Sequence, residues 1–277
     1  EQQGWPMKLA YVFYRPFERA VLQRAAAIVV ASPPYCDTSA ALQPWKPKCR
    51  VVPLGLDAQR LPVEAGPADA GAADAWPHDE TDQGDLNILA VGRLTYYKGF
   101  RYLIESIACG EGLRLDLVGT GDQEQELMRL ADSLGLRDRV TFHGTVDDVK
   151  LAQLMRRCDC LCLPSIERTE AFGMVLLEAM SFGKATVVSD VAGSGMGWIV
   201  DHGVTGLKVP PADSSALAEA FRALMVDRGR LAEMGRAGRE KFERMFEINH
   251  AVKGVIDTYL AVLAEPGQAT DGMRSSD

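Results

Sequence analysis

Six short apolar segments follow one another from residue 87 of the 277-residue chain, and helical patterns separate them. The segments lie at residues 87–91, 113–118, 140–142, 160–163, 185–189 and 206–209. They are rich in Val, Leu and Ile and do not alternate with polar residues, which is typical of parallel strands buried on both faces. Amphipathic stretches at 99–108, 123–134, 147–157, 172–182 and 213–225 predict the intervening helices. This alternation predicts an α/β fold built on a doubly wound parallel sheet.

The rest of the chain divides into shorter pieces. A helix at 17–24, a strand at 27–31, a second strand at 50–55 and an apolar helix at 248–263 are expected. Residues 61–85 carry seven acids, no Lys or Arg and no apolar period, which favours a solvated linker. Those seven charges account for nearly all of the net charge of −8. An acidic balance of this kind argues against a nucleic-acid partner held by phosphate contacts.

Cys158, Cys160 and Cys162 form a Cys-x-Cys-x-Cys run of a metal-ligand residue type. We expect them to share one face of a strand, where they cannot surround a tetrahedral zinc and serve as small core residues. The four histidines are isolated from one another, so no His-based metal site is expected.

The loop after residues 87–91 carries two cations at the carboxyl end of a predicted strand. Gly92 and Arg93 begin this loop and Lys98 ends it. Ligands of doubly wound sheets bind at such strand ends, and an Arg and a Lys together can clamp a diphosphate. Two solvated surface cations are the alternative.

Two further loops are rich in glycine. Residues 119–121 read Gly-Thr-Gly, but Glu124 replaces the last glycine of the dinucleotide motif, so this sequence supports an NAD site weakly. Residues 192–198 contain three glycines that either line a ligand or form a flexible loop.

The most specific pattern spans residues 170–179. Gly173 precedes a predicted helix, whose free amides favour phosphate. Glu170 lies before that helix and Glu178 lies two turns inside it, within an apolar stretch where a carboxylate needs a partner. Both carboxylates could accept hydrogen bonds from the vicinal hydroxyls of a sugar. The alternative is a helix-capping acid and a solvated Glu.

These motifs in this order resemble the retaining glycosyltransferases of the GT-B fold. The similar family is the large one of bacterial mannosyl-, glucosyl- and rhamnosyltransferases (glycosyltransferase family 4-like, group 1). The matching segments lie at residues 52–57, 91–94, 98–99, 117–121, 142–144, 170–178 and 202–211.

The resemblance implies a role for each candidate residue. Arg93 and Lys98 would bind the donor diphosphate, Glu170 the donor sugar and Glu178 the ribose. The remaining candidates would surround the phosphates, sugar and base: Gly92, Gly119, Gly144, Val146, Phe172, Gly173 and Met174.

The resemblance also implies the reaction. A sugar would pass from a GDP- or UDP-linked donor to a glycan or lipid-linked acceptor, without a metal or other cofactor, in cell-surface polysaccharide biosynthesis. A cytoplasmic protein is implied. Peripheral contact with the inner face of the membrane would involve acceptor-domain residues preceding residue 1.

The resemblance predicts an incomplete acceptor side. Residues 1–58 would be the last portion of a Rossmann-like acceptor domain, 59–85 a linker or insertion, and 86–245 the donor-binding Rossmann-like domain. Residues 246–264 would form a helix that crosses back, and 265–277 a disordered tail. The chain then looks truncated at its N-terminus.

Several alternatives stay open. The chain could be a nucleotide-sugar binding module without catalysis, or an NAD-type Rossmann oxidoreductase suggested by residues 119–121. A pyridoxal-phosphate phosphorylase has no lysine of distinctive context to support it. The sequence leaves the base, the sugar and the acceptor undetermined.

Overall fold

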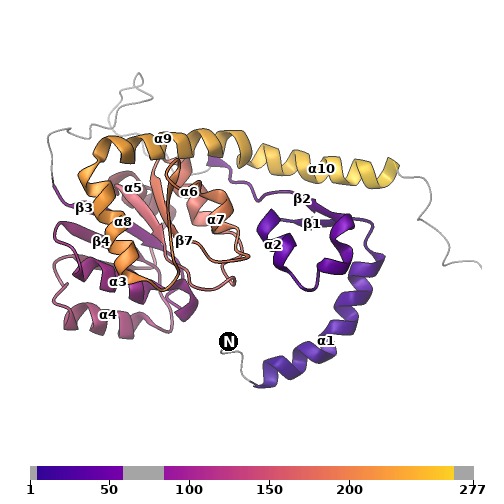
Figure 1. Cartoon of the computed structure of the whole chain (residues 1–277), viewed down its shortest axis with the longest axis horizontal. Coiled ribbons are helices and arrows are strands. Elements are labelled where there is room, and N and C mark those ends of the chain that lie inside the picture. The colour runs from indigo at the N-terminus through magenta and orange to yellow at the C-terminus, as the bar shows by residue number, and fades with distance from the viewer. Residues whose placement is uncertain (1–4, 59–83, 265–277) are drawn as a thin grey trace, which may run out of the picture.

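A computed structural model describes residues 5–58 and 84–264. Its larger sheet has six parallel strands in the order β5-β4-β3-β6-β7-β8. Figure 1 shows this sheet surrounded by helices, with the smaller N-terminal unit beside it. The strands are β3 (Leu86–Val91), β4 (Leu113–Val118), β5 (Val140–Gly144), β6 (Cys160–Leu163), β7 (Ala185–Ser189) and β8 (Gly206–Val209). The predicted α/β doubly wound parallel sheet is thus confirmed, and all six strands lie where the apolar segments indicated.

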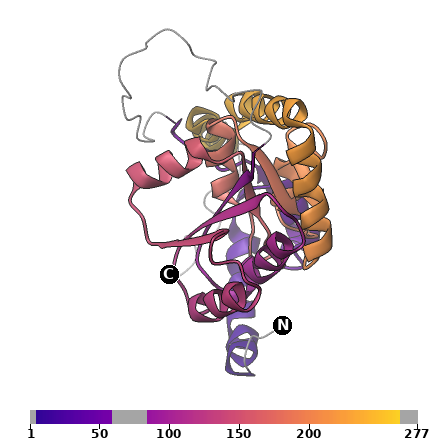
Figure 2. The same ribbon diagram turned by 90° about the vertical axis from the view of Figure 1, so that its left-hand side faces the viewer.

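Helices cover both faces of this sheet (Figure 2). One core lies under α3 (Phe100–Ala108), α4 (Glu124–Ser133) and α8 (Ser214–Val226). The other lies under α5 (Asp148–Arg157), α6 (Met174–Ser181) and the short α7 (Met196–Ile199). Helix α9 (Arg228–Met245) contributes to both cores, with Leu231 in the first and Phe242 in the second. Buried apolar side chains on both faces explain why the strands do not alternate with polar residues.

A smaller unit precedes the six-stranded sheet. It comprises α1 (Trp5–Arg24), β1 (Ile28–Val30), α2 (Pro33–Thr38), the 3₁₀ helix η1 (Gln43–Lys48) and β2 (Cys49–Val51). The strands β1 and β2 pair in parallel. Figure 1 shows α10 (Ile248–Ala264) running from the end of α9 toward this unit. The amide of Ile248 donates to the Leu56 carbonyl at 3.1 Å, so the start of α10 lies against the segment that follows β2.

Several helices of the structure were not predicted. Helix α1 begins at Trp5 rather than near residue 17, and α2 begins at Pro33, where two prolines suggested only a stop. Proline is tolerated in the first turn of a helix because the amides there have no helical partner. Helix α9 was missed because glycines interrupt its pattern. A Cβ on Gly235 would lie 2.0 Å from the Gly183 carbonyl oxygen, so that glycine permits close packing.

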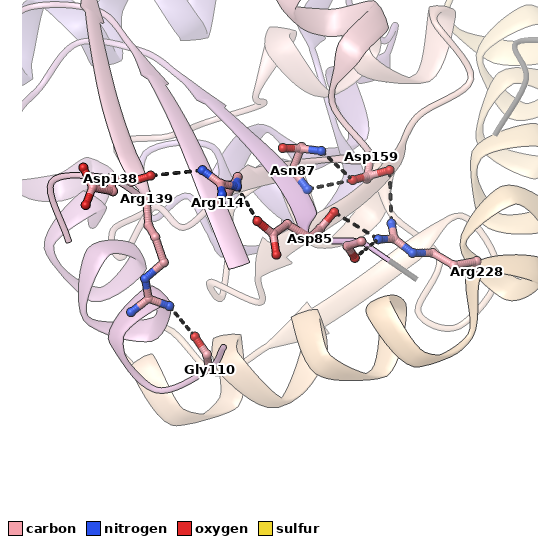
Figure 3. A network of polar contacts seen from close by, with 9 residues as sticks. Asp85, Asn87, Gly110, Arg114, Asp138, Arg139, Asp159 and Arg228 are labelled. Carbon is pink, nitrogen blue, oxygen red and sulfur yellow. Dashed lines mark hydrogen bonds and ion pairs between the residues drawn. The ribbon is translucent and has the colours of Figure 1, made fainter. Parts of the chain in front are cut away.

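Two predicted segments lie outside the described residues, namely the tail at 265–277 and nearly all of the acidic linker. The end of that linker is fixed at the amino end of the strands (Figure 3). Arg228 donates to the carbonyls of Gly84 and Asp85 at 3.0 and 3.1 Å and pairs with Asp159 at 3.1 Å. Asp159 in turn accepts from the Asn87 amide at 2.6 Å. This network joins β3, β6 and α9 at the sheet edge opposite the candidate site.

The three clustered cysteines are buried core residues, as expected. Their predicted arrangement on one face is wrong, because β6 begins only at Cys160. Cys160 and Cys162 lie in the first core and Cys158 in the second. Burial raises the pKa of each thiol, which keeps it protonated at neutral pH. Within the described residues, no three His, Cys, Asp or Glu side chains gather as a metal site would require.

No helix in residues 5–58 or 84–264 combines the length and the apolar character needed to cross a bilayer.

Candidate functional site

The strand order places the candidate site at the middle of the sheet. Strands β3 and β6 are neighbours, and the chain winds away from them in opposite directions. Such a switch point leaves a crevice at the carboxyl ends of the two strands, where ligands of open α/β sheets bind. The loop after β3 carries Arg93 and Lys98, and the loop after β6 carries Glu170. The topology therefore brings together the two loops that the sequence selected.

The backbones of these two loops lie against each other. The Ile166 amide donates to the Tyr97 carbonyl at 2.8 Å. Gly99 has φ +69°, and a Cβ there would lie 2.2 Å from the Pro164 carbonyl oxygen. Only glycine combines that conformation with so close an approach. Gly99 thus fixes the distance between the loops.

Lys98 and Glu170 form an ion pair across this junction. Their side chains are 12% and 13% exposed, so both charges are largely withdrawn from water. The Ser165 hydroxyl donates to the same carboxylate oxygen at 3.4 Å. A Cβ on Gly92 would lie 3.2 Å from the Lys98 ammonium, so the glycine makes room for it. The two side chains therefore hold each other in place.

Arg93 differs from Lys98 in its surroundings. Its side chain is exposed, and within residues 5–58 and 84–264 it has no ion-pair or hydrogen-bond partner. The site thus offers one free cation and one that is neutralised by a carboxylate.

The start of α6 faces the same loops. Gly173 caps the helix with φ +89°, and it packs against Leu163 and Leu176. Among the described residues, the amides of Met174 and Val175 have no hydrogen-bond acceptor. Phe172 is buried and contacts the Phe246 ring edge-on, with 6.3 Å between ring centroids. Free amides at the positive end of a helix dipole form a binding position for an anion.

Glu178 lies about one turn into α6, as its fifth residue, and is partly buried. Burial raises the pKa of its carboxyl, and the nearby Asp148 charge raises it further. Its carboxylate has no hydrogen-bond donor within the described part of the chain. A buried carboxylate without donors is unfavourable, so a ligand that brings hydroxyl groups would satisfy it.

The loops after β4 and β5 extend the site. Gly119 donates its amide to the Gly144 carbonyl at 2.8 Å, and a Cβ on Gly119 would lie 2.0 Å from the Gly92 carbonyl oxygen. Gly144 has φ +62° with no atom near its missing side chain, and Val146 packs partly into the second core. The loops after β3, β4 and β5 are therefore joined in sequence along the sheet edge.

This packing explains the Gly-Thr-Gly motif at 119–121. A Cβ on Gly121 would lie 2.3 Å from the Leu94 carbonyl oxygen, just as Gly119 contacts Gly92. Both glycines serve contact between loops. The motif also follows the second strand of the sheet in sequence, whereas a dinucleotide motif follows the first. The NAD-type oxidoreductase alternative rested on this motif, which loop packing now explains.

Sequence reasoning missed two serines that contact Glu170. Ser165 was passed over as part of a strand end, although its hydroxyl reaches the carboxylate. Ser194 lies in the glycine-rich stretch at 192–198, and its hydroxyl donates to the Glu170 carbonyl at 2.5 Å. That contact joins residues 24 apart in the chain, so the local sequence pattern does not predict it. The stretch is thus held against the segment that carries Glu170, which argues against the flexible-loop alternative.

The family comparison is consistent with this arrangement. Residues 76–241 match the family model described as "Glycosyl transferases group 1", which covers more than half of the chain. D-rhamnosyltransferase WbpZ of Pseudomonas aeruginosa is 35% identical over 84% of this chain and 58% of that protein. O-antigen chain mannosyltransferase C of Escherichia coli is 31% identical over 90% of this chain and 64% of that protein. The chain thus spans about three fifths of the length of these relatives.

Solved structures agree on the fold. Sucrose-phosphate synthase from Thermosynechococcus elongatus superposes with a TM-score of 0.73 at 30% identity, over 90% of this chain and 61% of that chain. HepE from Anabaena, solved in complex with UDP, superposes with a TM-score of 0.74 at 23% identity, over 89% of this chain and 68% of that chain. Both the sheet order and the family match lead to one conclusion: the chain belongs to the group 1 glycosyl transferases and has the GT-B type of α/β fold.

Proposed function

We propose that the chain is the donor-binding part of a retaining, metal-independent glycosyltransferase. It would take a sugar from a GDP- or UDP-linked donor and transfer it to a glycan or lipid-linked acceptor in cell-surface polysaccharide biosynthesis. The observation that carries the proposal is the Lys98–Glu170 pair, with Arg93 free beside it, at the switch point of the sheet. The name of the E. coli relative, an O-antigen chain mannosyltransferase, supports a role in O-antigen-type polymers, and that of the P. aeruginosa relative supports transfer of a hexose.

The diphosphate occupies the position between the two cations and the start of α6. Arg93 binds it as a planar fork, and the amides of Met174 and Val175 add uncharged donors. Lys98 exchanges its bond with Glu170 for one with a phosphate oxygen. These donors then stabilise the charge that develops on the leaving diphosphate, which is the work that a metal ion does in other transferases.

The two carboxylates bind different sugar rings of the donor. Once Lys98 turns to the phosphate, Glu170 is free to accept hydrogen bonds from hydroxyls of the donor sugar. Glu178, which lacks donors in the empty site, accepts from the ribose hydroxyls. Gly119 and residues 144–146 flank the base. The proposed retaining route lets the departing phosphate deprotonate the acceptor, so no carboxylate pair of the glycosidase kind is required.

The proposal is tested in a version of the protein extended to the full length of its relatives. Lys98→Ala should lower turnover by about 10²–10³, as expected for the loss of one preorganised charge donor. Lys253→Ala, which removes an exposed lysine of α10, serves as the control. Near-normal turnover of Lys98→Ala would contradict the diphosphate role, and an inverted anomeric centre in the product would contradict retention.

A second candidate function is nucleotide-sugar binding without transfer. The coverage of only 58% and 64% of the first two relatives favours it for this chain taken alone. It predicts binding of a nucleoside diphosphate and no transfer to any acceptor. Transfer of labelled sugar by the 277-residue chain would exclude it.

We place the activity in the cytoplasm, with the acceptor side at the inner face of the membrane. Fractionation of cells that produce the full-length protein tests this placement, and recovery of the protein from an extracellular fraction would contradict it.

A further inference from the structure

The glycine-rich turn after β7 contacts the segment that carries Glu170. Ser194 is 2% exposed, and its hydroxyl donates to the Glu170 carbonyl at 2.5 Å. The next amide, that of Gly195, donates to the Ala171 carbonyl at 2.8 Å. Two successive backbone carbonyls are thus held by two successive residues of another loop. This double contact fixes the backbone of Glu170 independently of its ion pair with Lys98.

The smaller unit supports this turn from the other side. Gly193 has φ +79°, and a Cβ there would lie 2.4 Å from the Thr38 hydroxyl oxygen. A Cβ on Gly195 would lie 3.2 Å from the hydroxyl of Ser32, which is fully buried. Arg168, two residues before Glu170, donates to the Thr38 carbonyl at 3.2 Å. Residues 193–195 are therefore enclosed between the α2 segment and the loop that carries Glu170.

The side chain and the backbone of Glu170 have different partners. Lys98 and Ser165 contact its carboxylate, whereas Ser194 contacts its main chain. When a diphosphate draws Lys98 away, the carboxylate loses its strongest partner. The backbone bonds to Ser194 and Gly195 are unaffected by that exchange. They are then the contacts that keep Glu170 aimed at the sugar.

We propose that Ser194, within the turn at 193–195, is a positioning residue for Glu170 and so for recognition of the donor sugar. This inference rests on the proposed function and assigns it a residue outside the phosphate-binding set. It requires that the turn affect binding of the sugar and leave binding of the nucleoside diphosphate alone.

Calorimetric titrations of the chain with UDP, GDP, UDP-glucose and GDP-mannose test the proposal. The readout is the ratio of the dissociation constant of the nucleotide sugar to that of its nucleoside diphosphate. Ser194→Ala should raise this ratio about three- to tenfold, the range for one net hydrogen bond. Binding of UDP or GDP should stay within about twofold of the parent, because no phosphate contact changes.

Gly195→Ala provides a second variant that keeps the Ser194 hydroxyl. Its φ of −72° suits alanine, but the new Cβ would lie 2.9 Å from the Ala171 carbonyl oxygen and displace the Glu170 segment. The same rise in the ratio is expected. Ser106→Ala is the matched control, since Ser106 is also buried and donates to a backbone carbonyl, that of Leu103 at 2.6 Å. It should lose similar stability and leave the ratio unchanged.

The outcomes separate this inference from the proposed function. If the parent chain binds neither UDP nor GDP, both are overturned. If it binds a nucleotide but Ser194→Ala and Gly195→Ala leave the ratio at its parent value, the inference fails and the proposed function stands. An equal rise in Ser106→Ala would also overturn it, because the effect would then follow stability rather than position.

Discussion

If Lys98 exchanges Glu170 for a phosphate oxygen, removal of the Glu170 charge should strengthen nucleotide binding, although Glu170 lies in the binding site. In the structure the Lys98 ammonium is already neutralised by Glu170. A diphosphate must break that pair before it gains the lysine. Glu170→Gln replaces the charged acceptor with a neutral one of nearly the same shape. We therefore expect this variant to bind a nucleoside diphosphate more tightly, although it should transfer sugar less well.

The magnitude follows from the burial of the pair. Both side chains are less than 15% exposed, so solvent screens their interaction only weakly. Hydrogen bonds to charged groups contribute about 1.5–3 kcal/mol and ordinary ones about 0.5–1.5 kcal/mol, and the variant keeps the charged donor but loses the charged acceptor. Glu170→Gln should therefore destabilise the empty chain by about 1–2 kcal/mol. In the parent, a diphosphate must spend this free energy to separate Lys98 from Glu170. In the variant that cost is absent, so UDP or GDP should bind about 5–30 times more tightly.

Two measurements check this expectation. Urea denaturation gives the free energy of unfolding of the empty chain, and calorimetry gives the nucleotide affinity. Glu243→Gln is the matched control, because Glu243 pairs with Arg239 at 2.9 Å on an exposed face of α9. A surface pair contributes about 0–1 kcal/mol, so this variant should change little. Unchanged or weaker nucleotide binding by Glu170→Gln would refute the exchange of partners.

Three further predictions test other parts of the structure. Gly135→Ala and Gly99→Ala place alanine at φ +70° and +69°, but only Gly99 faces a carbonyl. The first should destabilise the chain by about 1–2 kcal/mol and the second by about 1–3 kcal/mol more, measured by urea denaturation; equal losses would contradict the packing of Gly99 on Pro164. The folded pKa of Glu178 is raised above its ordinary value of 4.5, so between these two values the folded chain binds more protons and its stability falls as pH rises. Glu178→Gln should therefore be more stable than the parent at pH 7 and similar at pH 4, while binding nucleotide more weakly; lower stability at pH 7 would show that the carboxylate has a stabilising partner. Finally, a thiol reagent at pH 8 should modify the exposed Cys109 rapidly and Cys49 slowly, since burial and a hydrogen bond with the free thiol of Cys36 raise the pKa of Cys49 to about 11. Cys158, Cys160 and Cys162 should react only on unfolding, and rapid reaction of any of them in the native chain would contradict their place in the core.

The sequence sufficed for the parts of the fold that local pattern determines. The six strands were predictable because parallel strands between helices must be apolar on both faces. The pairing of the loops at 92–99 and 164–173 was predictable in outline, since both follow strands. Residues whose role depends on a distant contact were not. The glycines of α9 read as interruptions because their use, contact with the 183–185 turn, lies about 50 residues away.

The candidate site shows the same division. Arg93, Lys98 and Glu170 were selected from the sequence because of their place at strand and helix ends, and Glu178 because its carboxylate lies in an apolar stretch. The Lys98–Glu170 pair was not predicted, because it joins residues 72 apart. The contact of Ser194 with Glu170 was not predicted either, because the glycine-rich composition around Ser194 indicates only conformational freedom. Residue type at a strand end thus predicts which groups reach the site, and the three-dimensional contacts determine which of them are free.

The central claim is that two cations at the switch point bind a nucleoside diphosphate. Its most direct test is a calorimetric titration of the chain and of the Arg93→Ala/Lys98→Ala double variant with UDP and GDP, with NADH as the comparison. We expect one of the two diphosphates to bind at a single site, NADH to bind far more weakly, and the double variant to lose about 10²–10⁴ in affinity, the value of two charge-assisted hydrogen bonds. Binding of equal strength by the double variant, or preferential binding of NADH, would contradict the account.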